Sequence, residues 1–268
     1  MRVIVPADYF KASQFDEIYA EQVAAFLHLG YTASTFAFEG DRRFRPAIEA
    51  GDLVLYRGWM LGETEYAAFE EQVNTAGGRL LTSTEAYLNT HHLPRWFPLI
   101  ADLTPETVCF RDLSSVETGL RGLGWDRFFI KDFVKSLKTG SGSLIEQPEQ
   151  IGVLMQEMEQ FRGKIEGGIC ARRFEEFRPD SEQRYFVIDG LAASSDGTTP
   201  PQIVQDCAGR ISSRFFSVDV AARADGRLRV VEIGDGQVSD LVGWSVSRFA
   251  ELWSQRLPGM TERGVAPL

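Results

Sequence analysis

The stretch FFSVDVAARADGRLRVVEIGDG, residues 215–236, consists of two apolar segments separated by Asp225-Gly226. An Asp-Gly pair between such segments is typical of a β-hairpin with a two-residue type I′ turn. With that turn, Ala224 pairs with Arg227, and Asp219 lies directly opposite Glu232. Like charges placed opposite each other on one face of a sheet destabilise the pair of strands.

Two facing carboxylates need a proton or a cation between them. Mg²⁺ takes one or two carboxylates, together with water and usually substrate phosphates. Asp235 and Gln237 follow the second segment and could add oxygen ligands. The alternative is an exposed hairpin whose carboxylates are hydrated or paired with Arg223 or Arg229. The residues of the hairpin leave both interpretations open.

A second stretch, FFIKDFVKSLKTGSGS at residues 128–143, indicates an anion site. Lys131 ends an apolar strand, where a lysine is costly unless it points into a polar cleft. Small residues after it would let backbone N–H groups approach a phosphate. The stretch has neither the GxxxxGK[ST] nor the GxGxxG pattern, so a solvated basic loop remains the alternative. This loop comprises Lys135, Lys138, Thr139, Gly140, Ser141, Gly142 and Ser143.

Arg184 begins the strand RYFVIDG. A guanidinium at the start of a strand can bind a phosphate or a carboxylate through two parallel hydrogen bonds. It could instead pair with a nearby acid, namely Glu175, Glu176 or Glu182.

Composition narrows the function classes. The chain has 268 residues and a net charge of −10, which disfavours sequence-independent binding to nucleic acid. No apolar run approaches the ~18 residues of a membrane span, and the N-terminus becomes polar too early for a signal peptide. The three cysteines, Cys109, Cys170 and Cys207, are far apart and odd in number. We therefore expect no disulfide framework and a cytoplasmic, reducing location.

The order of the expected elements predicts mixed α/β and α+β lobes. Strands alternate with helices over residues 1–100, including helices at 16–29 and from a Thr64 cap to Gly77, which indicates a small open α/β lobe. Residues 105–190 read as strand, loop, helix, strand and strand, typical of an α+β lobe. The loop-like segment LAASSDGTTPPQ leads into a last lobe, residues 191–268, with the hairpin and a final helix.

This order of parts resembles the ATP-grasp superfamily over residues 85–245. The blocks YRGWM, EAYLNTHHLPRWF and VEIGDGQVSDL are similar to a little-characterised branch from bacteria and phages. The resemblance implies two α+β lobes that close on ATP, at residues 101–268, preceded by the α/β lobe. It also implies that ATP and Mg²⁺ are bound, and that the activity is a carboxylate–amine ligase acting through an acyl phosphate.

The resemblance assigns roles by position. Lys131 and Arg184 would act on the phosphates, and Arg57 and Trp59 would contact the substrate. Asp219, Glu232 and Asp235 would bind the metal, although Glu232-Ile233-Gly234 departs from the usual Glu-x-Asn, which puts the third ligand in doubt. A second nucleotide lysine is missing, so His91, His92 or Arg95 could replace it. The nucleotide would contact Lys131, the loop Lys138, Thr139, Gly140, Ser141, Gly142 and Ser143, the hinge Arg173, Phe174, Glu175, Glu176 and Phe177, and Glu182.

The partners implied are carboxylate and amine substrates, either small molecules or peptides, without nucleic acid or membrane. The interpretation allows a homodimer. A non-catalytic nucleotide-binding module and an ATP-grasp phosphotransferase remain the alternatives.

Overall fold

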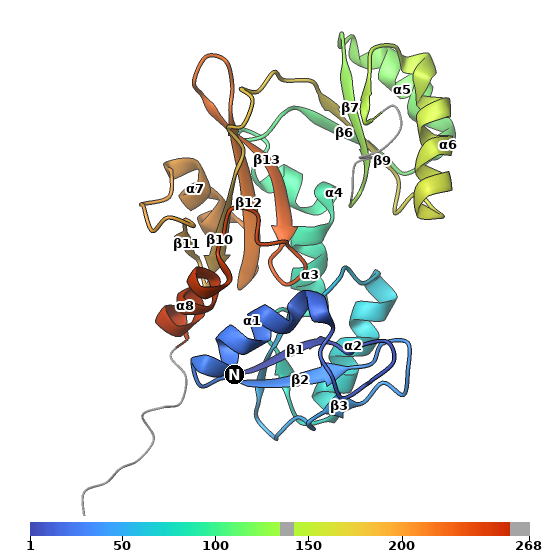
Figure 1. Cartoon of the computed structure of the whole chain (residues 1–268). Coiled ribbons are helices and arrows are strands. Elements are labelled where there is room, and N and C mark those ends of the chain that lie inside the picture. The colour runs from blue at the N-terminus through green and yellow to red at the C-terminus, as the bar shows by residue number, and fades with distance from the viewer. Residues whose placement is uncertain (135–141, 258–268) are drawn as a thin grey trace, which may run out of the picture. The chain divides into compact units, whose positions relative to one another are not determined.

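The structure is a computed structural model that describes residues 1–134 and 142–257. Its contacts divide the chain into two units (Figure 1). Unit 1 consists of Met1–Leu88, Gln183–Val218 and the chain from Gly234 onward, and unit 2 consists of Asn89–Glu182 and Asp219–Ile233. The lobe boundaries expected near residues 100 and 190 remain predictions.

The first part of unit 1 is an open, mostly parallel sheet. Its strands are β1 (Arg2–Pro6), β2 (Thr32–Phe36), β3 (Phe44–Arg45), β4 (Leu53–Tyr56) and β5 (Arg79–Leu80), in the order β3-β2-β1-β4-β5. Only β3, which the sequence did not predict, pairs antiparallel. The side chain of Asp16 caps α1 (Glu17–His28). The residue that precedes α2 (Glu63–Thr75) is Gly62 and not the predicted Thr64. The N–H of Gly62 donates a hydrogen bond to the side chain of Glu65.

A second sheet has the order β11-β10-β12-β13. It contains β10 (Gln183–Ile188), β11 (Leu191–Ala193), β12 (Phe215–Ala222) and β13 (Leu228–Asp235), and the helices α7 (Gln202–Arg210) and α8 (Val246–Arg256) follow β11 and β13 along the chain. β11 lies in the segment predicted as a loop, and α7 was not predicted. Phe186, Phe215, Phe249 and Trp253 are buried in one core with residues of α1.

Unit 2 is built on the sheet β6-β9-β7-β8. Its strands are β6 (Thr107–Phe110), β7 (Phe128–Asp132), β8 (Leu144–Ile145) and β9 (Ile169–Arg173). Figure 1 shows α5 (Val116–Leu123) and α6 (Ile151–Arg162) side by side along this sheet. The remaining helices are α3 (Thr84–His91), α4 (Leu93–Trp96) and the short 3₁₀ helices Phe97–Leu99, Leu113–Ser115 and Pro148–Gln150.

The two faces of this sheet differ in composition. Phe128, Ile130, Ile169 and Ala171 pack with α5 and α6 in one core cluster. Because successive side chains of a strand point to opposite faces, Lys131, Cys170 and Arg172 lie on the other face. Lys131 is directly paired with Cys170, so a lysine, an arginine and a cysteine share the face that the helices do not cover.

The cysteines correct one expectation. Cys109 and Cys170 are paired across β6 and β9, and their sulfur atoms form a disulfide. The expectation of no disulfide was therefore wrong: residues that are 61 positions apart in sequence become neighbours through strand pairing. Cys207 is buried and is not part of this disulfide.

The hairpin loop also differs from the prediction. Arg223 N–H donates to the carbonyl of Arg227, and Gly226 N–H donates to the carbonyl of Arg223. Three residues therefore form the loop, with Gly226 at φ +86°, which is a type I turn followed by a bulge. At the other end of the hairpin, Gly236 N–H donates to Phe215, in the register originally predicted. β13 therefore contains one more residue than β12 between these two points, as in a β-bulge.

No helix in the described residues is long and apolar enough to cross a membrane.

Candidate active site

The structure brings two of the predicted site residues together in unit 2. Lys131 Nζ lies 2.8 Å from Glu232 Oε1, and the side chains are 5% and 41% exposed. Lys131 comes from the end of β7 and Glu232 from β13. Burial of an ammonium group is costly unless a charge partner is present. Glu232 provides such a partner for Lys131.

Arg172, which sequence reasoning missed, lies on the same sheet face as Lys131. Its Nη1 donates to the carbonyl of Val231 at 2.5 Å, and its Nη2 donates to Thr104 Oγ1 at 2.5 Å. Its Nε is buried without a hydrogen-bond partner. Burial lowers the pKa of Arg172 to about 10, and the charge of Glu232 opposes this shift. The arginine therefore fixes the β13 backbone immediately before Glu232 in sequence. The alternation of ICARR along β9 was the signal that could have placed Arg172 beside Lys131.

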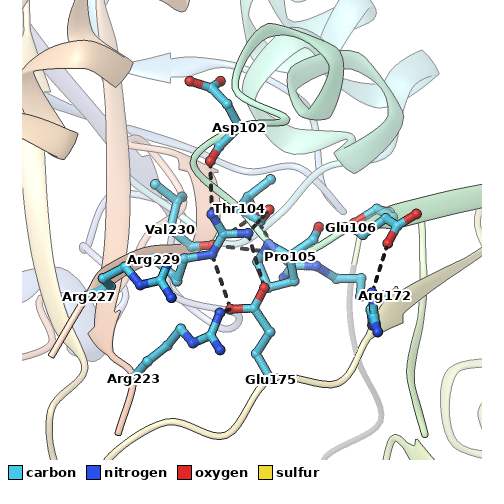
Figure 2. A network of polar contacts seen from close by, with 12 residues as sticks. Asp102, Thr104, Pro105, Glu106, Arg172, Glu175, Arg223, Arg227, Arg229 and Val230 are labelled. Carbon is cyan, nitrogen blue, oxygen red and sulfur yellow. Dashed lines mark hydrogen bonds and ion pairs between the residues drawn. The ribbon is translucent and has the colours of Figure 1, made fainter. Parts of the chain in front are cut away.

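Glu175, in the predicted adenine hinge, is fixed by two arginines from the hairpin (Figure 2). Arg229 donates to both of its carboxylate oxygens at 3.1 Å, and Arg223 lies 3.5 Å away. Arg229 also donates to the carbonyls of Asp102 and Thr104. The hinge segment is therefore tied to the strand that carries Glu232, and the Glu175 carboxylate is engaged with protein.

The rest of the hinge is held less tightly. The Arg127 guanidinium lies 3.8 Å from the centre of the Phe174 ring. Arg173 and Glu106 form an exposed pair at 3.5 Å. Glu176 and Glu182 are exposed and remain predicted nucleotide contacts.

Asp219 also belongs to unit 2, and its side chain is buried in β12, 3% exposed. Asp219 and Glu232 come from the two strands of one hairpin, and together they could provide the one or two carboxylates that Mg²⁺ needs from a protein. A complete protein cage is not formed: among residues 1–134 and 142–257, no three His, Cys, Asp or Glu side chains could hold a metal ion. Asp219 and Glu232 remain the proposed pair.

Asp235 differs from the other predicted metal ligands. It is fully buried, it belongs to unit 1, and its Oδ1 accepts hydrogen bonds from the backbone and side-chain amides of Gln237 at 3.0 and 3.1 Å. Gln237 in turn donates to the hydroxyl of Tyr66 at 2.7 Å. These contacts stabilise the turn after β13. The role of Asp235 as a metal ligand remains a prediction.

The predicted substrate and phosphate arginines of unit 1 both hold the segment after β13. Arg57 is 2% exposed and donates to the carbonyls of Gly236 and Ser239 and to Gln22. Burial lowers its pKa to about 10. Arg184 Nη1 donates to the carbonyl of Asp240 at 2.9 Å. Trp59 is 41% exposed, and its ring lies 5.8 Å from that of Phe38.

The predicted phosphate loop is only partly described. Five of the residues predicted for this loop lie outside the described part of the chain, namely Lys135, Lys138, Thr139, Gly140 and Ser141. Gly142 has φ +77°, and Ser143 is buried with its carbonyl accepting from Ile130 N–H at 2.7 Å. His91, one of the residues that could replace the missing lysine, ends α3 and is 8% exposed. His92 is intermediate in exposure, and Arg95 is exposed and donates to Asn89.

The chain combines an open α/β sheet, an antiparallel sheet with a lysine strand and a hairpin that carries carboxylates, and this combination is typical of the ATP-grasp fold. A family model, described as an ATP-grasp domain of R2K clade family 3, matches residues 109–255. The chain belongs to this family, and the predicted fold and resemblance are confirmed.

Solved structures show the same fold. D-cycloserine synthetase DcsG is 17% identical, with a TM-score of 0.66, over 96% of this chain and 99% of that one. A RimK domain ATP-grasp protein from Sphaerobacter thermophilus is also 17% identical, with a TM-score of 0.63, over 94% and 98%. The ATP-grasp ligase PsnB, in complex with its minimal precursor, Mg and ADP, is 15% identical, with a TM-score of 0.58, over 95% and 97%. No curated protein matches this chain.

Proposed function

We propose that the protein is an ATP- and Mg²⁺-dependent carboxylate–amine ligase that acts on a small molecule or a peptide. The observation that carries the proposal is the pair between the buried Lys131 and the half-exposed Glu232, at 2.8 Å, in the unit that also contains the buried Asp219. A lysine and two carboxylates are the groups needed to hold a metal nucleotide. Membership of the ATP-grasp family and the likeness to a ligase solved with Mg and ADP support the same activity.

The proposed reaction has two steps. An oxygen of the substrate carboxylate attacks the γ-phosphorus of ATP, the bond to ADP breaks, and an acyl phosphate forms. An amine then attacks the acyl carbon, phosphate leaves with the C–O electron pair, and the nitrogen loses a proton to give the amide. The protein's task is to position the reactants and neutralise charge.

Each residue has a proposed role. Lys131 exchanges Glu232 for a nucleotide phosphate, and the freed Glu232 acts with Asp219 to hold Mg²⁺, which neutralises charge on the phosphates when bound. Arg172 positions Glu232 through the Val231 carbonyl. Arg184 remains a proposed phosphate ligand, and Trp59 a proposed substrate contact. Because all three donor nitrogens of Arg57 are engaged by protein, we propose that it positions the segment after β13.

Hydroxylamine trapping tests this function. The protein is incubated with ATP, Mg²⁺, hydroxylamine and pools of amino acids, hydroxy acids and short peptides, and hydroxamate and ADP are measured. Hydroxylamine intercepts an acyl phosphate, so equal amounts of ADP and hydroxamate are expected from one pool, and none from Glu232→Gln. A phosphorylated product without hydroxamate would indicate a phosphotransferase and contradict the proposal.

A nucleotide-binding module without turnover is the second candidate. The observation that favours it is Asp235, whose carboxylate is engaged by Gln237, which leaves two carboxylates for the metal. ATP binding without ADP formation in any pool would select this function. A cytoplasmic location and a homodimer remain part of the proposal, and the oxidation state of Cys109 and Cys170 in cells tests the location.

A further inference from the structure

A polar cavity of about 330 Å³ lies in unit 1, outside the groups proposed for ligation. Its walls come from β11, the loop after it, α7 and α8. The polar side chains in the walls are hydroxyls, amides and two guanidinium groups, contributed by Ser194, Thr198, Thr199, Gln205, Arg248, Gln255 and Arg256. No aspartate or glutamate of residues 1–134 and 142–257 lines it. The cavity is therefore rich in donors and carries positive charge, within a protein whose net charge is −10.

Among the described residues, the two arginines lack an ion-pair partner. The Nε atoms of Arg248 and Arg256 are both buried and lack a hydrogen-bond partner. Neither guanidinium forms an ion pair with any residue in the described part of the chain. The loop of the cavity contains one acid, Asp196. Its carboxylate accepts hydrogen bonds from the N–H and hydroxyl of Thr198, at 3.0 and 2.7 Å, and these bonds lower its pKa.

Buried donors without acceptors destabilise a protein, and two like charges at one cavity add repulsion. Both costs disappear when an anion with several acceptor oxygens enters. A phosphate group carries a charge of about −1.5 to −2 near neutral pH and three or more acceptor oxygens, which matches two guanidinium groups. A carboxylate has one charge and two oxygens, and would leave one arginine unmatched.

We propose that Arg248 and Arg256 form a binding site for a phosphate group, with the loop hydroxyls as further donors. The ligand is free phosphate or a small phosphorylated molecule, since the cavity has room for more than the phosphate. The loop is held in place for this role: Ser194 Oγ donates to the Thr198 carbonyl at 2.5 Å. Gly197 adopts φ +79°, and a Cβ atom added at this position would lie 3.8 Å from Arg248 Nη2, so the loop backbone runs close to the guanidinium.

This site is separate from the one proposed for ligation. Phe249 and Trp253 on α8 point into the core, where the Arg57 guanidinium lies 4.9 Å from the Phe249 ring. A neighbouring face of the same helix carries Arg248, Leu252 and Arg256. Arg248 directly precedes Phe249 and Leu252 directly precedes Trp253, and one residue corresponds to a rotation of about 100° around an α-helix. Phosphate binding at α8 therefore needs neither Lys131 nor the hairpin carboxylates.

Calorimetry on the full chain tests the proposal, with inorganic phosphate, a sugar phosphate, a nucleoside monophosphate and acetate as probes. Phosphate should bind to the wild type and to Lys131→Met with equal affinity. Arg248→Gln and Arg256→Gln should each weaken binding at least tenfold. The matched control is Arg79→Gln, which removes an exposed arginine of strand β5 and should leave the phosphate affinity unchanged. Tighter binding of one phosphorylated probe than of inorganic phosphate identifies a metabolite as the source.

Thermal unfolding provides the second measurement. The double variant Arg248→Gln/Arg256→Gln should melt no lower than the wild type without phosphate, and should lose the rise in Tm that phosphate causes. The proposal is overturned if phosphate does not bind, if acetate binds as tightly, or if the double variant keeps the phosphate response. Loss of phosphate binding in Lys131→Met alone would also overturn it, because the anion would then lie at the other site.

Discussion

Lys131 and Glu232 have unequal environments, although they form one ion pair. The Lys131 side chain is 5% exposed and the Glu232 side chain is 41% exposed. An exposed carboxylate that loses its partner can be hydrated, whereas a buried ammonium group cannot. The lysine therefore depends on the glutamate more than the glutamate depends on the lysine.

This inequality predicts the stability of two variants. Glu232→Gln should lower the free energy of unfolding by about 1–3 kcal/mol, because it leaves a buried charge unpaired. Lys131→Met should cost less, because it replaces that charge with an apolar chain of similar length. Urea denaturation of both variants and of the double variant measures the difference. The matched control is Glu117→Gln, which breaks the exposed pair with Arg121 and should cost below about 0.5 kcal/mol. A larger loss in Lys131→Met than in Glu232→Gln would contradict the assignment.

The sequence predicted the individual charges of this site better than their partners. Lys131 was found because it interrupts the apolar run FFIKDFV, and such a residue must have a polar environment. Arg172 was missed because it stands beside a second arginine in ICARRFEEF, and the alternation along this short strand shows which one is buried only when it is combined with the pairing of β9 and β7. The bonds between Glu175 and the hairpin arginines join residues 48 and 54 positions apart, which no local pattern connects.

Among the secondary-structure elements, the hairpin shows how one dipeptide fits two turns. Asp-Gly suits a two-residue type I′ turn, and Gly in the left-handed region also suits a three-residue loop with a bulge. The sequence predicted where the chain turns and which segments form β12 and β13. It could not determine the register, which changes by one residue between the two ends of the hairpin. The short strands β3 and β11 were missed because two or three residues carry no periodicity.

Gly226 has a testable role in this loop. At φ +86° an added Cβ atom would lie 3.6 Å from Arg178 Nη2, an ordinary contact, so a substitution is opposed by the backbone conformation alone. Gly226→Ala should lower the free energy of unfolding by about 1 kcal/mol. Gly226→Asn should cost less, because asparagine tolerates the left-handed region. Equal stability of wild type and Gly226→Ala in urea denaturation would show that this residue does not adopt positive φ.

The link between the hinge and the hairpin makes a second prediction about elements. Glu175 is 12% exposed and is the only acid bonded to both Arg223 and Arg229 in the described chain. Glu175→Gln should raise hydrogen exchange at residues 174–177 and 223–229, because it removes the charge partner of the partly buried Arg229 and leaves Arg223 with Asp225, at 3.9 Å.

Exchange in α6, which packs on the other face of the sheet, should remain unchanged and serves as the internal control. Faster exchange in all of these segments would mean that Glu175 stabilises the whole unit and not the hinge.

For the whole molecule, the family assignment and the fold are fixed, and the nucleotide supplies the decisive test of the site. A ligand that binds only the folded state stabilises it by mass action, by about 2.7 kcal/mol at a concentration of 100 Kd. ATP with Mg²⁺ should therefore raise the Tm by several degrees. EDTA should reduce the shift, because Asp219 and Glu232 can share a site with the nucleotide phosphates only when a cation lies between them.

Lys131→Met should weaken ATP binding at least tenfold, whereas Arg248→Gln should leave it unchanged. Wild-type protein whose Tm does not respond to millimolar ATP with Mg²⁺ would contradict the proposed role of the hairpin carboxylates, while a shift that survives in Lys131→Met would place the nucleotide elsewhere.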